Sequence, residues 1–246
     1  MRNVALIAAH TSADVGPNIL LQELDGVKLI CHTYHSVQET GLFQDVFVVS
    51  ANDEVIQAVK DCGGKAIKNK ASHHTATDSI AEIAMDIDAD VFVNIPGNLP
   101  FTSKNSLHKL ISTFDSPYGN NIQVASIVQK FKTAGDAADV KHVKVAIDLR
   151  QNALFFSHSV IPYLKNPSFM INYYRHVPVY AYRKIELLNF ALLPKSPLES
   201  AEQIECLRFI ENGVPIRMII SQYPDITIRS TEDFALAADY KATVSA

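Results

Sequence analysis

The sequence has few cysteines and no apolar stretch long enough to cross a membrane. Cys31, Cys62 and Cys206 are the only cysteines among 246 residues, and they lie far apart in the chain. An odd, scattered set of this kind fits reduced thiols better than a disulfide framework. No apolar run approaches the roughly 18 residues of a membrane span, and the apolar segment 4–9 is too brief for a signal peptide. We therefore expect a soluble, cytoplasmic protein with no membrane partner.

The chain also lacks an excess of positive charge and several common catalytic motifs. Its formal net charge is -4, whereas a bulk nucleic-acid partner needs clustered Lys and Arg. There is no G-x-x-x-x-G-K-[ST] loop, no G-x-G-x-x-G fingerprint and no G-x-S-x-G elbow. These absences argue against a nucleic-acid-binding protein, a P-loop enzyme, a dinucleotide dehydrogenase and a serine hydrolase. Cys31 and His35 have a spacing that metal ligands use, but without a second pair we interpret them as packed side chains.

Short apolar runs alternate with helix signals over the first 115 residues. At 48% hydrophobic residues, the chain has ample material for a core. The runs predict strands at 4–9, 46–49, 66–67 and 91–95, and the apolar spacing between them predicts helices. The helix signals are Asn52 or Asp53, Thr75 with Asp78, and Ser103 as N-caps, and Gly41 as a left-handed C-cap. This alternation predicts an α/β fold with a mostly parallel sheet.

The second half of the sequence is less regular. It contains the predicted strands 124–128, 143–147, 153–156, 177–182 and 216–220, and predicted helices at 184–190, after Ser200 with Gln203 as a capping box, and after Ser230 with Asp233. The short turn between 143–147 and 153–156 predicts a hairpin. We therefore expect antiparallel additions to the sheet.

The stretch 90–101 organises these expectations around a site. A buried strand at 91–95 is stopped abruptly by Pro96-Gly97 and Pro100. The loop therefore follows the carboxyl end of a strand, which is the edge where open α/β sheets bind ligands. We expect the functional residues to gather at this edge.

Several segments occur together in the order and spacing of one known family. They are His73-His74-Thr75-Ala76-Thr77-Asp78-Ser79, Val93-Asn94-Ile95-Pro96-Gly97-Asn98-Leu99-Pro100, Val143-Lys144-Val145, Ala153-Leu154-Phe155-Phe156-Ser157-His158, Arg175-His176-Val177-Pro178-Val179-Tyr180-Ala181-Tyr182-Arg183, Pro197-Leu198-Glu199 through Glu205-Cys206-Leu207-Arg208, and Ile228-Arg229-Ser230-Thr231-Glu232-Asp233. On these segments the chain resembles 3-deoxy-manno-octulosonate cytidylyltransferase, the CMP-Kdo synthetase family, over nearly its whole length.

The resemblance implies a Rossmann-like nucleotide-diphospho-sugar transferase fold in a single nucleotidyltransferase-like domain, 1–246. Residues 1–115 would bind the nucleotide, and residues 116–246 would bind the sugar and form a homodimer. In the family, the anomeric hydroxyl of the sugar attacks the α-phosphorus of CTP and pyrophosphate leaves, assisted by magnesium. The implied ligands are CTP or CMP and an octulosonate-type sugar, and the implied role is cytoplasmic supply of activated sugar for lipopolysaccharide.

The resemblance also assigns site residues by position. The nucleotide-binding residues would be Ala9, His10, Thr75 and Thr77, and the substrate-binding residues would be Gly97, Asn98, His176, Tyr180, Glu205 and Arg229. Lys144 keeps its family identity, whereas Cys206 replaces a glutamine. His176, Tyr180 and Glu205 are equally compatible with a purely structural role, because an aromatic strand and a packed helix give the same pattern.

The departures from the family fall on charged positions. The family's first loop carries two arginines and a lysine, and the matching places here are Ala8-Ala9-His10, Val15 and Pro17-Asn18-Ile19. Asn98 and Arg229 stand where the magnesium-binding aspartates would be, and Ser79 and His158 replace two further arginines. At an effective dielectric near 20, a guanidinium about 4 Å from a divalent cation repels it by roughly 8 kcal/mol.

We therefore predict no metal cofactor and leave the catalytic residues unassigned. Arg229 could instead hold a phosphate or the sugar carboxylate in a bidentate pair. The charge argument favours weakened or lost transfer in a non-catalytic relative that binds a nucleotide or sugar, or regulates an active partner. The alternatives are a CMP-sugar synthetase with altered phosphate contacts and an unrelated sugar-nucleotide binder.

Overall fold

The computed structural model describes residues 1–9, 18–166, 168–223 and 226–244, with the side chains of the last helix as far as residue 238. The elements of the first half are β1 (Asn3–Ala8), η1 (Ile19–Leu21), β2 (Glu23–Leu24), β3 (Val27–Lys28), α1 (Leu29–Glu39), β4 (Asp45–Ser50), α2 (Asp53–Asp61), β5 (Ala66–Lys68), α3 (Ala76–Ala84), β6 (Val91–Pro96) and α4 (Lys104–Asp115). Those of the second half are η2 (Gly119–Asn121), β7 (Val124–Lys130), η3 (Asp136–Ala138), β8 (Lys144–Ile147), β9 (Ala153–Ser157), β10 (Tyr174–Arg183), α5 (Lys184–Leu192), α6 (Pro197–Glu202), α7 (Leu207–Glu211), β11 (Ile216–Ser221) and α8 (Thr231–Val244).

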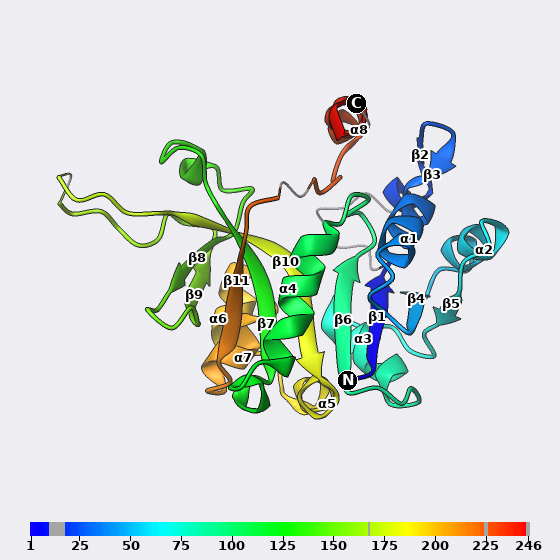
Figure 1. The fold of residues 1–246 in the computed structure, drawn as a ribbon, viewed down its shortest axis with the longest axis horizontal. Coiled ribbons are helices and arrows are strands. Elements are labelled where there is room, and N and C mark those ends of the chain that lie inside the picture. The colour runs from blue at the N-terminus through cyan, green and yellow to red at the C-terminus, as the bar shows by residue number, and fades with distance from the viewer. Residues whose placement is uncertain (10–17, 167, 224–225, 245–246) are drawn as a thin grey trace.

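One sheet runs through both halves of the chain (Figure 1). Its strand order is β11-β7-β10-β6-β1-β4-β5, and the β8–β9 hairpin joins it through β10. β1 pairs in parallel with β4 and β6, whereas β10 is antiparallel to both β6 and β7. The predicted α/β fold, with a mostly parallel sheet and antiparallel additions, is confirmed.

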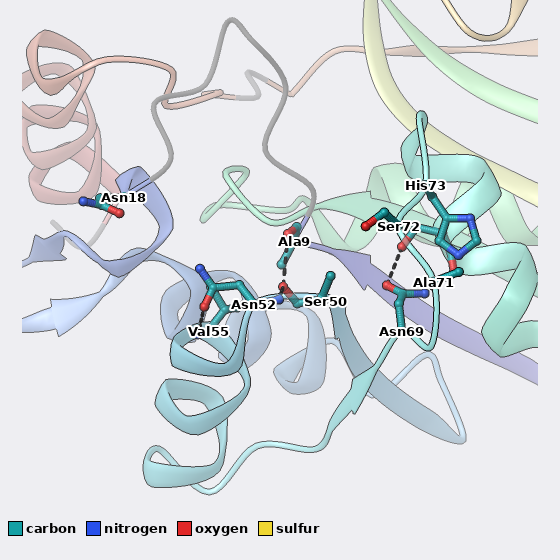
Figure 2. A pocket seen from close by; sticks show the side chains of 11 residues that line it. Ala9, Asn18, Ser50, Asn52, Val55, Asn69, Ala71, Ser72 and His73 are labelled. Atoms are coloured by element: carbon teal, nitrogen blue, oxygen red, sulfur yellow. Dashed lines mark hydrogen bonds between the residues drawn. The ribbon is translucent and has the colours of Figure 1, made fainter.

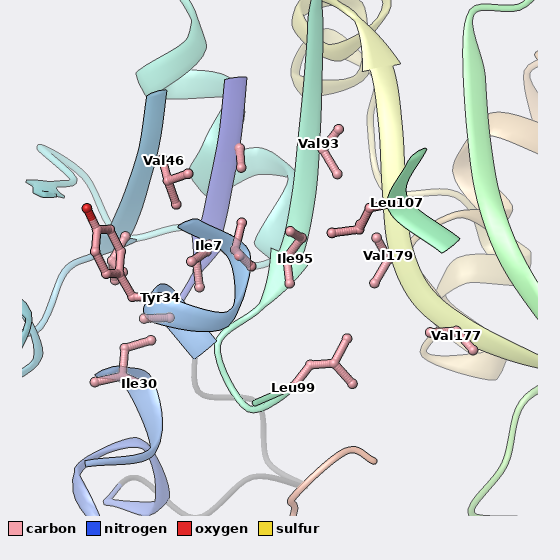
Figure 3. Packing of buried hydrophobic residues seen from close by; sticks show 14 of the residues in the cluster. Ile7, Ile30, Tyr34, Val46, Val93, Ile95, Leu99, Leu107, Val177 and Val179 are labelled. Carbon is pink, nitrogen blue, oxygen red and sulfur yellow. The ribbon is translucent and has the colours of Figure 1, made fainter. Parts of the chain in front are cut away.

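Helices cover both faces of this sheet. On one face α1 and α4 pack over the strands, and Figure 3 shows Ile30 and Tyr34 of α1 and Leu107 of α4 against Ile7 and Ile95. The other face carries the core that includes residues of α3, α5 and α7. Apolar burial on both faces explains why β1 and β6 read as continuous hydrophobic runs. No helix in the described part of the chain is long and apolar enough to cross a membrane.

The predicted helix caps hold at four places. The side chain of Asn52 accepts hydrogen bonds from the amides that open α2, Thr75 accepts from the Asp78 amide, and Ser103 accepts from the Ser106 amide. Gly41 follows α1 with a φ of 66°. These caps fix where α2 and α3 begin, directly beyond the edge that carries the site.

The predicted capping box at Ser200 and Gln203 is wrong. Ser196 and Glu199 form the box instead, at the start of α6, and Pro197 takes the first helical position. Gln203 ends α6 in the left-handed conformation, with a φ of 55°. The sequence contains both the Ser196–Glu199 and the Ser200–Gln203 pattern. The helix begins at the first of them, which also supplies proline in the first turn.

Candidate functional site

The loop after β6 is held close to the end of β1. The Gly97 amide donates to the carbonyl of Ala8 at 2.9 Å, and Thr33 Oγ1 donates to the Gly97 carbonyl at 2.7 Å. A Cβ at Gly97 would lie 2.9 Å from Ile30 Cδ1 and 3.3 Å from the Ala8 oxygen. The close approach of this loop to β1 and α1 therefore requires glycine.

Asn98 ties the same loop to the segment that precedes α8. Its side-chain Nδ2 donates to the carbonyl of Ile228 at 2.8 Å, and the Ile228 amide donates back to the carbonyl of Asn98 at 2.9 Å. Asn98 is buried, at 8% exposed, so this reciprocal pair is shielded from water. An ionised aspartate has no N–H with which to make the first bond. The amide therefore joins the two segments by direct contact.

The residues beside this contact do not fit magnesium. Mg²⁺ prefers hard oxygen ligands, usually carboxylates. Asp233, the nearby acid in the sequence, accepts from the amides of Arg229 and Ser230 at 2.7 and 2.9 Å at the start of α8. Arg229, the residue after Ile228, carries a positive charge, and its Nη1 donates to the carbonyl of Lys141 at 2.9 Å. Within the described ranges, no group of three or more His, Cys, Asp or Glu side chains is arranged to hold a metal.

Lys144, at the start of β8, is fully buried and has a structural role. Its Nζ donates to the carbonyls of Asp139 and His142 at 3.0 and 2.7 Å. Burial lowers the pKa of this ammonium below its ordinary value. Lys144 therefore fixes the loop between η3 and β8, the loop that Arg229 also reaches.

A cavity of about 250 Å³ opens at the ends of β1, β4 and β5 (Figure 2). It is lined by Ala9, Asn18, Ser50, Ala51, Asn52, Val55, Asn69, Ala71, Ser72, His73 and Ser79. Hydroxyl and amide groups dominate the polar part of this lining, and none of the described residues that form it is a Lys, Arg, Asp or Glu. Such a surface suits an uncharged ring that offers donors and acceptors, such as a nucleobase.

The inner wall of the cavity is closed by a reciprocal pair between Asn69 and Ser79. Asn69 Nδ2 donates to the carbonyl of Ser79 at 2.9 Å, and Ser79 Oγ donates to Asn69 Oδ1 at 2.8 Å. Ser79 is the position where the resembled family has arginine. A short neutral side chain there leaves open space that a long cation would otherwise enter.

The outer wall of the cavity is fixed by Glu82 of α3. Its carboxylate accepts from the amides of Lys70 and Ala71, and His73 Nε2 lies 2.6 Å from Oε2. Partial burial acts to raise the pKa of Glu82, but these hydrogen bonds outweigh it and the pKa is lowered. The ionised carboxylate therefore holds the segment 70–73 on α3.

Thr77 and Glu205 join the two halves of the chain. The amide and hydroxyl of Thr77 donate to the carboxylate of Glu205 at 3.2 and 2.9 Å, and Thr77 Oγ1 also lies 3.2 Å from the hydroxyl of Tyr182. Burial raises the pKa of the Glu205 carboxyl, although the hydrogen bonds from Thr77 act in the opposite direction. The start of α3 is thereby locked to the turn before α7.

His176 and Tyr180 lie on the same side of β10 as this pair. His176 Nε2 is 3.0 Å from Ser126 Oγ, and its ring contacts Tyr180 edge-on at 5.2 Å. Burial lowers the pKa of His176 to about 3, so the ring is neutral at neutral pH. Tyr180 is only 2% exposed. His176 and Glu205, both half-buried, therefore have surface to offer a ligand where Tyr180 has almost none.

A buried charge network lies behind these residues. Arg208 donates to both carboxylate oxygens of Glu199, at 2.8 and 2.6 Å, and to Asp78 at 3.2 Å, and its guanidinium lies 4.1 Å from the Phe190 ring centroid. The sequence placed Arg208 and Glu199 in a matching segment but gave them no role. Spacing alone could not reveal them, because Asp78 comes from a distant helix.

The structure sorts the predicted site residues into three places. Ala9 lines the cavity, and Thr75, Thr77, His176, Tyr180 and Glu205 gather beside β10. Gly97 and Asn98 lie at the end of β6, where Asn98 contacts Ile228, the residue before Arg229. His10 lies outside the described residues. Ser50, Asn52 and Asn69 were missed as cavity residues, although they stand just after the ends of β4 and β5, where ligands collect.

Comparisons with known proteins show the family of this chain. A family model described as cytidylyltransferase matches residues 17–219. The 3-deoxy-manno-octulosonate cytidylyltransferases of Christiangramia forsetii and Flavobacterium johnsoniae are each 36% identical to the chain, over 96% of it and 95% and 97% of their own lengths. The chain belongs to the 3-deoxy-manno-octulosonate cytidylyltransferase family.

Solved structures similar to this family member support the same fold. One is a structure of CMP:2-keto-3-deoxy-manno-octonic acid synthetase complexed with CTP, with a TM-score of 0.90, 30% identity and 99% of each chain covered. Another is the 4-diphosphocytidyl-2C-methyl-D-erythritol synthase of Anaerococcus prevotii, with a TM-score of 0.64 and 16% identity over 98% of each chain. At that identity the second likeness concerns the fold alone.

Proposed function

We propose that this member of the 3-deoxy-manno-octulosonate cytidylyltransferase family binds a cytidine nucleotide and an octulosonate-type acid, with magnesium-dependent cytidylyl transfer weakened or lost. The observation that carries the proposal is the hydrogen bond from Asn98 to Ile228, which puts a neutral donor where the family has a metal-binding carboxylate. Arg229 beside it opposes a divalent cation by charge. Neither Asn98 nor Arg229 belongs to the described lining of the cavity beside Ala9.

Nucleotide binding is supported by the cavity beside Ala9. Its neutral polar lining suits a base, and the similar synthetase structure was solved in complex with CTP. The cavity wall is preorganised, because Asn69 with Ser79 and Glu82 with the segment 70–73 are bonded without a ligand. In this proposal Ala9 borders the nucleotide at the cavity, whereas Thr75 and Thr77, which lie outside the cavity lining, and His10 are assigned to it by position only.

Sugar binding is supported by the group beside β10. Glu205 offers a carboxylate, already oriented by Thr77, that can accept hydrogen bonds from sugar hydroxyls. His176 is a neutral ring and offers one hydrogen bond without a fixed charge. In the family reaction, the anomeric hydroxyl forms a bond to the α-phosphorus while the bond to pyrophosphate breaks. These residues would orient the sugar for that attack.

The retained sugar group also favours a second candidate, an active CMP-sugar synthetase with altered phosphate contacts. The carboxylate of Glu205 is oriented by Thr77 and the ring of His176 is neutral, so this group can still orient a sugar for attack. This candidate makes the opposite prediction for turnover. Like the first candidate, it predicts that CTP and 3-deoxy-manno-octulosonate each bind.

We extend the proposal to a single domain, a homodimer and a cytoplasmic location. The segment between β9 and β10 projects from the body of the molecule (Figure 1). It exposes Tyr163, Phe169 and Met170 at 85%, 62% and 93%. Large exposed apolar side chains on one projecting segment support a dimer face. That face would also serve a regulatory pairing with an active relative.

Calorimetry and a coupled assay of pyrophosphate release test the proposal. We expect CTP and 3-deoxy-manno-octulosonate each to bind, and pyrophosphate release with both ligands and Mg²⁺ to stay below the roughly 1 to 1000 per second of ordinary enzymes. Turnover inside that range would refute the loss of transfer and establish the second candidate. Absence of binding by both ligands would refute the whole proposal.

A further inference from the structure

The loop after β6 and the segment before α8 form a closed contact without a bridging ion. Asn98 and Ile228 exchange two hydrogen bonds, 2.8 and 2.9 Å long, and Ile228 is fully buried. Arg229 follows Ile228 directly, so the position of its main chain is fixed by this clamp. The two hydrogen bonds therefore hold the main chain at Arg229 in a defined position.

Most N–H donors of the Arg229 guanidinium have no partner among the described residues. Within the described residues its one side-chain hydrogen bond runs from Nη1 to the carbonyl of Lys141, at 2.9 Å, and no carboxylate lies within ion-pair distance. A guanidinium has five N–H donors in a planar fork. Asp233 does not neutralise it, because that carboxylate is taken up by the amides of Arg229 and Ser230 and by the hydroxyl of Ser230.

Two further cationic residues, Arg175 of β10 and Lys144 of β8, are paired between their strands near the loop that Arg229 reaches. The pKa of His142 is lowered by its burial, and the positive charges of Arg175, Arg229 and Lys144 act in the same direction, while Asp139 opposes them. Arg175 is itself bonded to Gln129. Among the described charges near His142, Arg175, Arg229 and Lys144 are positive and Asp139 is negative, a balance that suits an anion better than a divalent cation.

We propose that Arg229 forms an oxyanion subsite that works without a metal ion, in the place where relatives use magnesium. Its ligand is either the phosphoryl oxygens of the nucleotide or the carboxylate of the sugar acid, since both accept a bidentate guanidinium pair. The inference rests on the proposed function, because one of those two ligands must bind nearby. It goes beyond that function by assigning the charge that replaces the metal.

Titration calorimetry in EDTA, with CTP, CMP and 3-deoxy-manno-octulosonate as separate probes, tests the subsite. The wild-type chain should bind CTP in EDTA at least as tightly as in Mg²⁺. Arg229→Gln should weaken one probe by about tenfold or more, the loss expected for a charge-assisted hydrogen bond. A loss confined to CTP identifies the phosphoryl groups, and a loss confined to the sugar acid identifies its carboxylate. Arg229→Lys should keep part of the affinity, because it retains the charge and loses the fork.

The matched control is Arg150→Gln, which removes the same charge from the exposed turn between β8 and β9. It should leave all three affinities within about twofold, and thermal melting should show each variant folded. Unchanged affinities in Arg229→Gln would overturn the subsite. So would CTP binding that requires Mg²⁺, although nucleotide binding itself would then stand. Failure of the wild-type chain to bind any probe would remove the proposed function together with the subsite.

Discussion

Thr77 and Glu205 lie 128 residues apart in the chain and are joined by two hydrogen bonds, one from the amide and one from the hydroxyl of Thr77. The amide is also one of the orphan donors at the start of α3, so the carboxylate caps the helix as well as joining the halves. The contact thus makes the position of α3 depend on the turn before α7.

Thr77→Ala should destabilise the fold by about 1–3 kcal/mol, because a half-buried carboxylate loses one of its donors. Thr77→Ser keeps the hydroxyl and should cost much less. Since burial already raises the pKa of Glu205, the loss should be largest at high pH, where the carboxyl is ionised, and should shrink as the pH falls through that raised pKa. Urea denaturation at several pH values measures it, and a loss that does not vary with pH would contradict the assignment.

Gly97→Ala should destabilise the protein by about 1–3 kcal/mol through overpacking. The new methyl would meet Ile30 Cδ1 at 2.9 Å and the Ala8 oxygen at 3.3 Å. Ile30→Val removes the first of these atoms, so the double variant should lose less than the sum of the two single losses. Denaturant titration of the wild-type protein and the three variants measures the free energies of unfolding for this double-mutant cycle. Strict additivity would mean that the methyl does not press on Ile30.

Local signals made most of the fold predictable from the sequence. Asn52, Thr75 and Ser103 cap helices as their positions indicated, because a cap is decided within four residues of the chain. The error at Ser200 has the same origin, since two adjacent patterns compete there and only Ser196 is followed by proline. The prediction of a helix cap therefore depends only on the few residues around that cap.

The site was predictable only in part, because its decisive contacts are long-range. The sequence showed that Asn98 and Arg229 replace acids, but the bond from Asn98 to Ile228 spans 130 residues and has no local signature. Asn69, just after β5, also bonds Ser79 of α3 ten residues later, and neither residue type marks the other as its partner. The sequence shows which residues stand at these positions, whereas their hydrogen-bond partners are known only from the structure.

Glu199→Gln should cost about 3–5 kcal/mol, because it leaves Arg208 buried with one of its two carboxylate partners. The control is Asp86→Asn, which breaks an exposed pair with Lys70 and should cost no more than about 1 kcal/mol. Chemical denaturation measures both. Equal losses would show that burial adds nothing to the Arg208 pair.

The neutral His176 should make the fold less stable as the pH falls. Its pKa is about 3 when folded and 6.5 as an ordinary value, so the unfolded chain takes up the proton first. The contribution is fully present above about pH 6.5 and is lost progressively towards pH 3. His176→Gln keeps a hydrogen-bonding group near Ser126 and removes the titration, so its stability should fall less steeply over this window. Parallel slopes for the two proteins would show that the ring is protonated in the folded state.

Replacing both Asn98 and Arg229 by aspartate should create a site that binds Mg²⁺. Asn98→Asp alone should destabilise the protein by about 1–3 kcal/mol, because a carboxylate would face the carbonyl of Ile228 without a donor between them. Adding Arg229→Asp removes the opposing charge and supplies a second hard oxygen ligand. At a Mg²⁺ concentration ten times the dissociation constant, the double variant should gain about 1.4 kcal/mol, or roughly 3–6 °C in Tm. Thermal melting with Mg²⁺ and with EDTA reads this out, and the wild-type chain should show no such shift. A double variant that is equally indifferent to Mg²⁺ would mean that residues 98 and 229 do not face a common site.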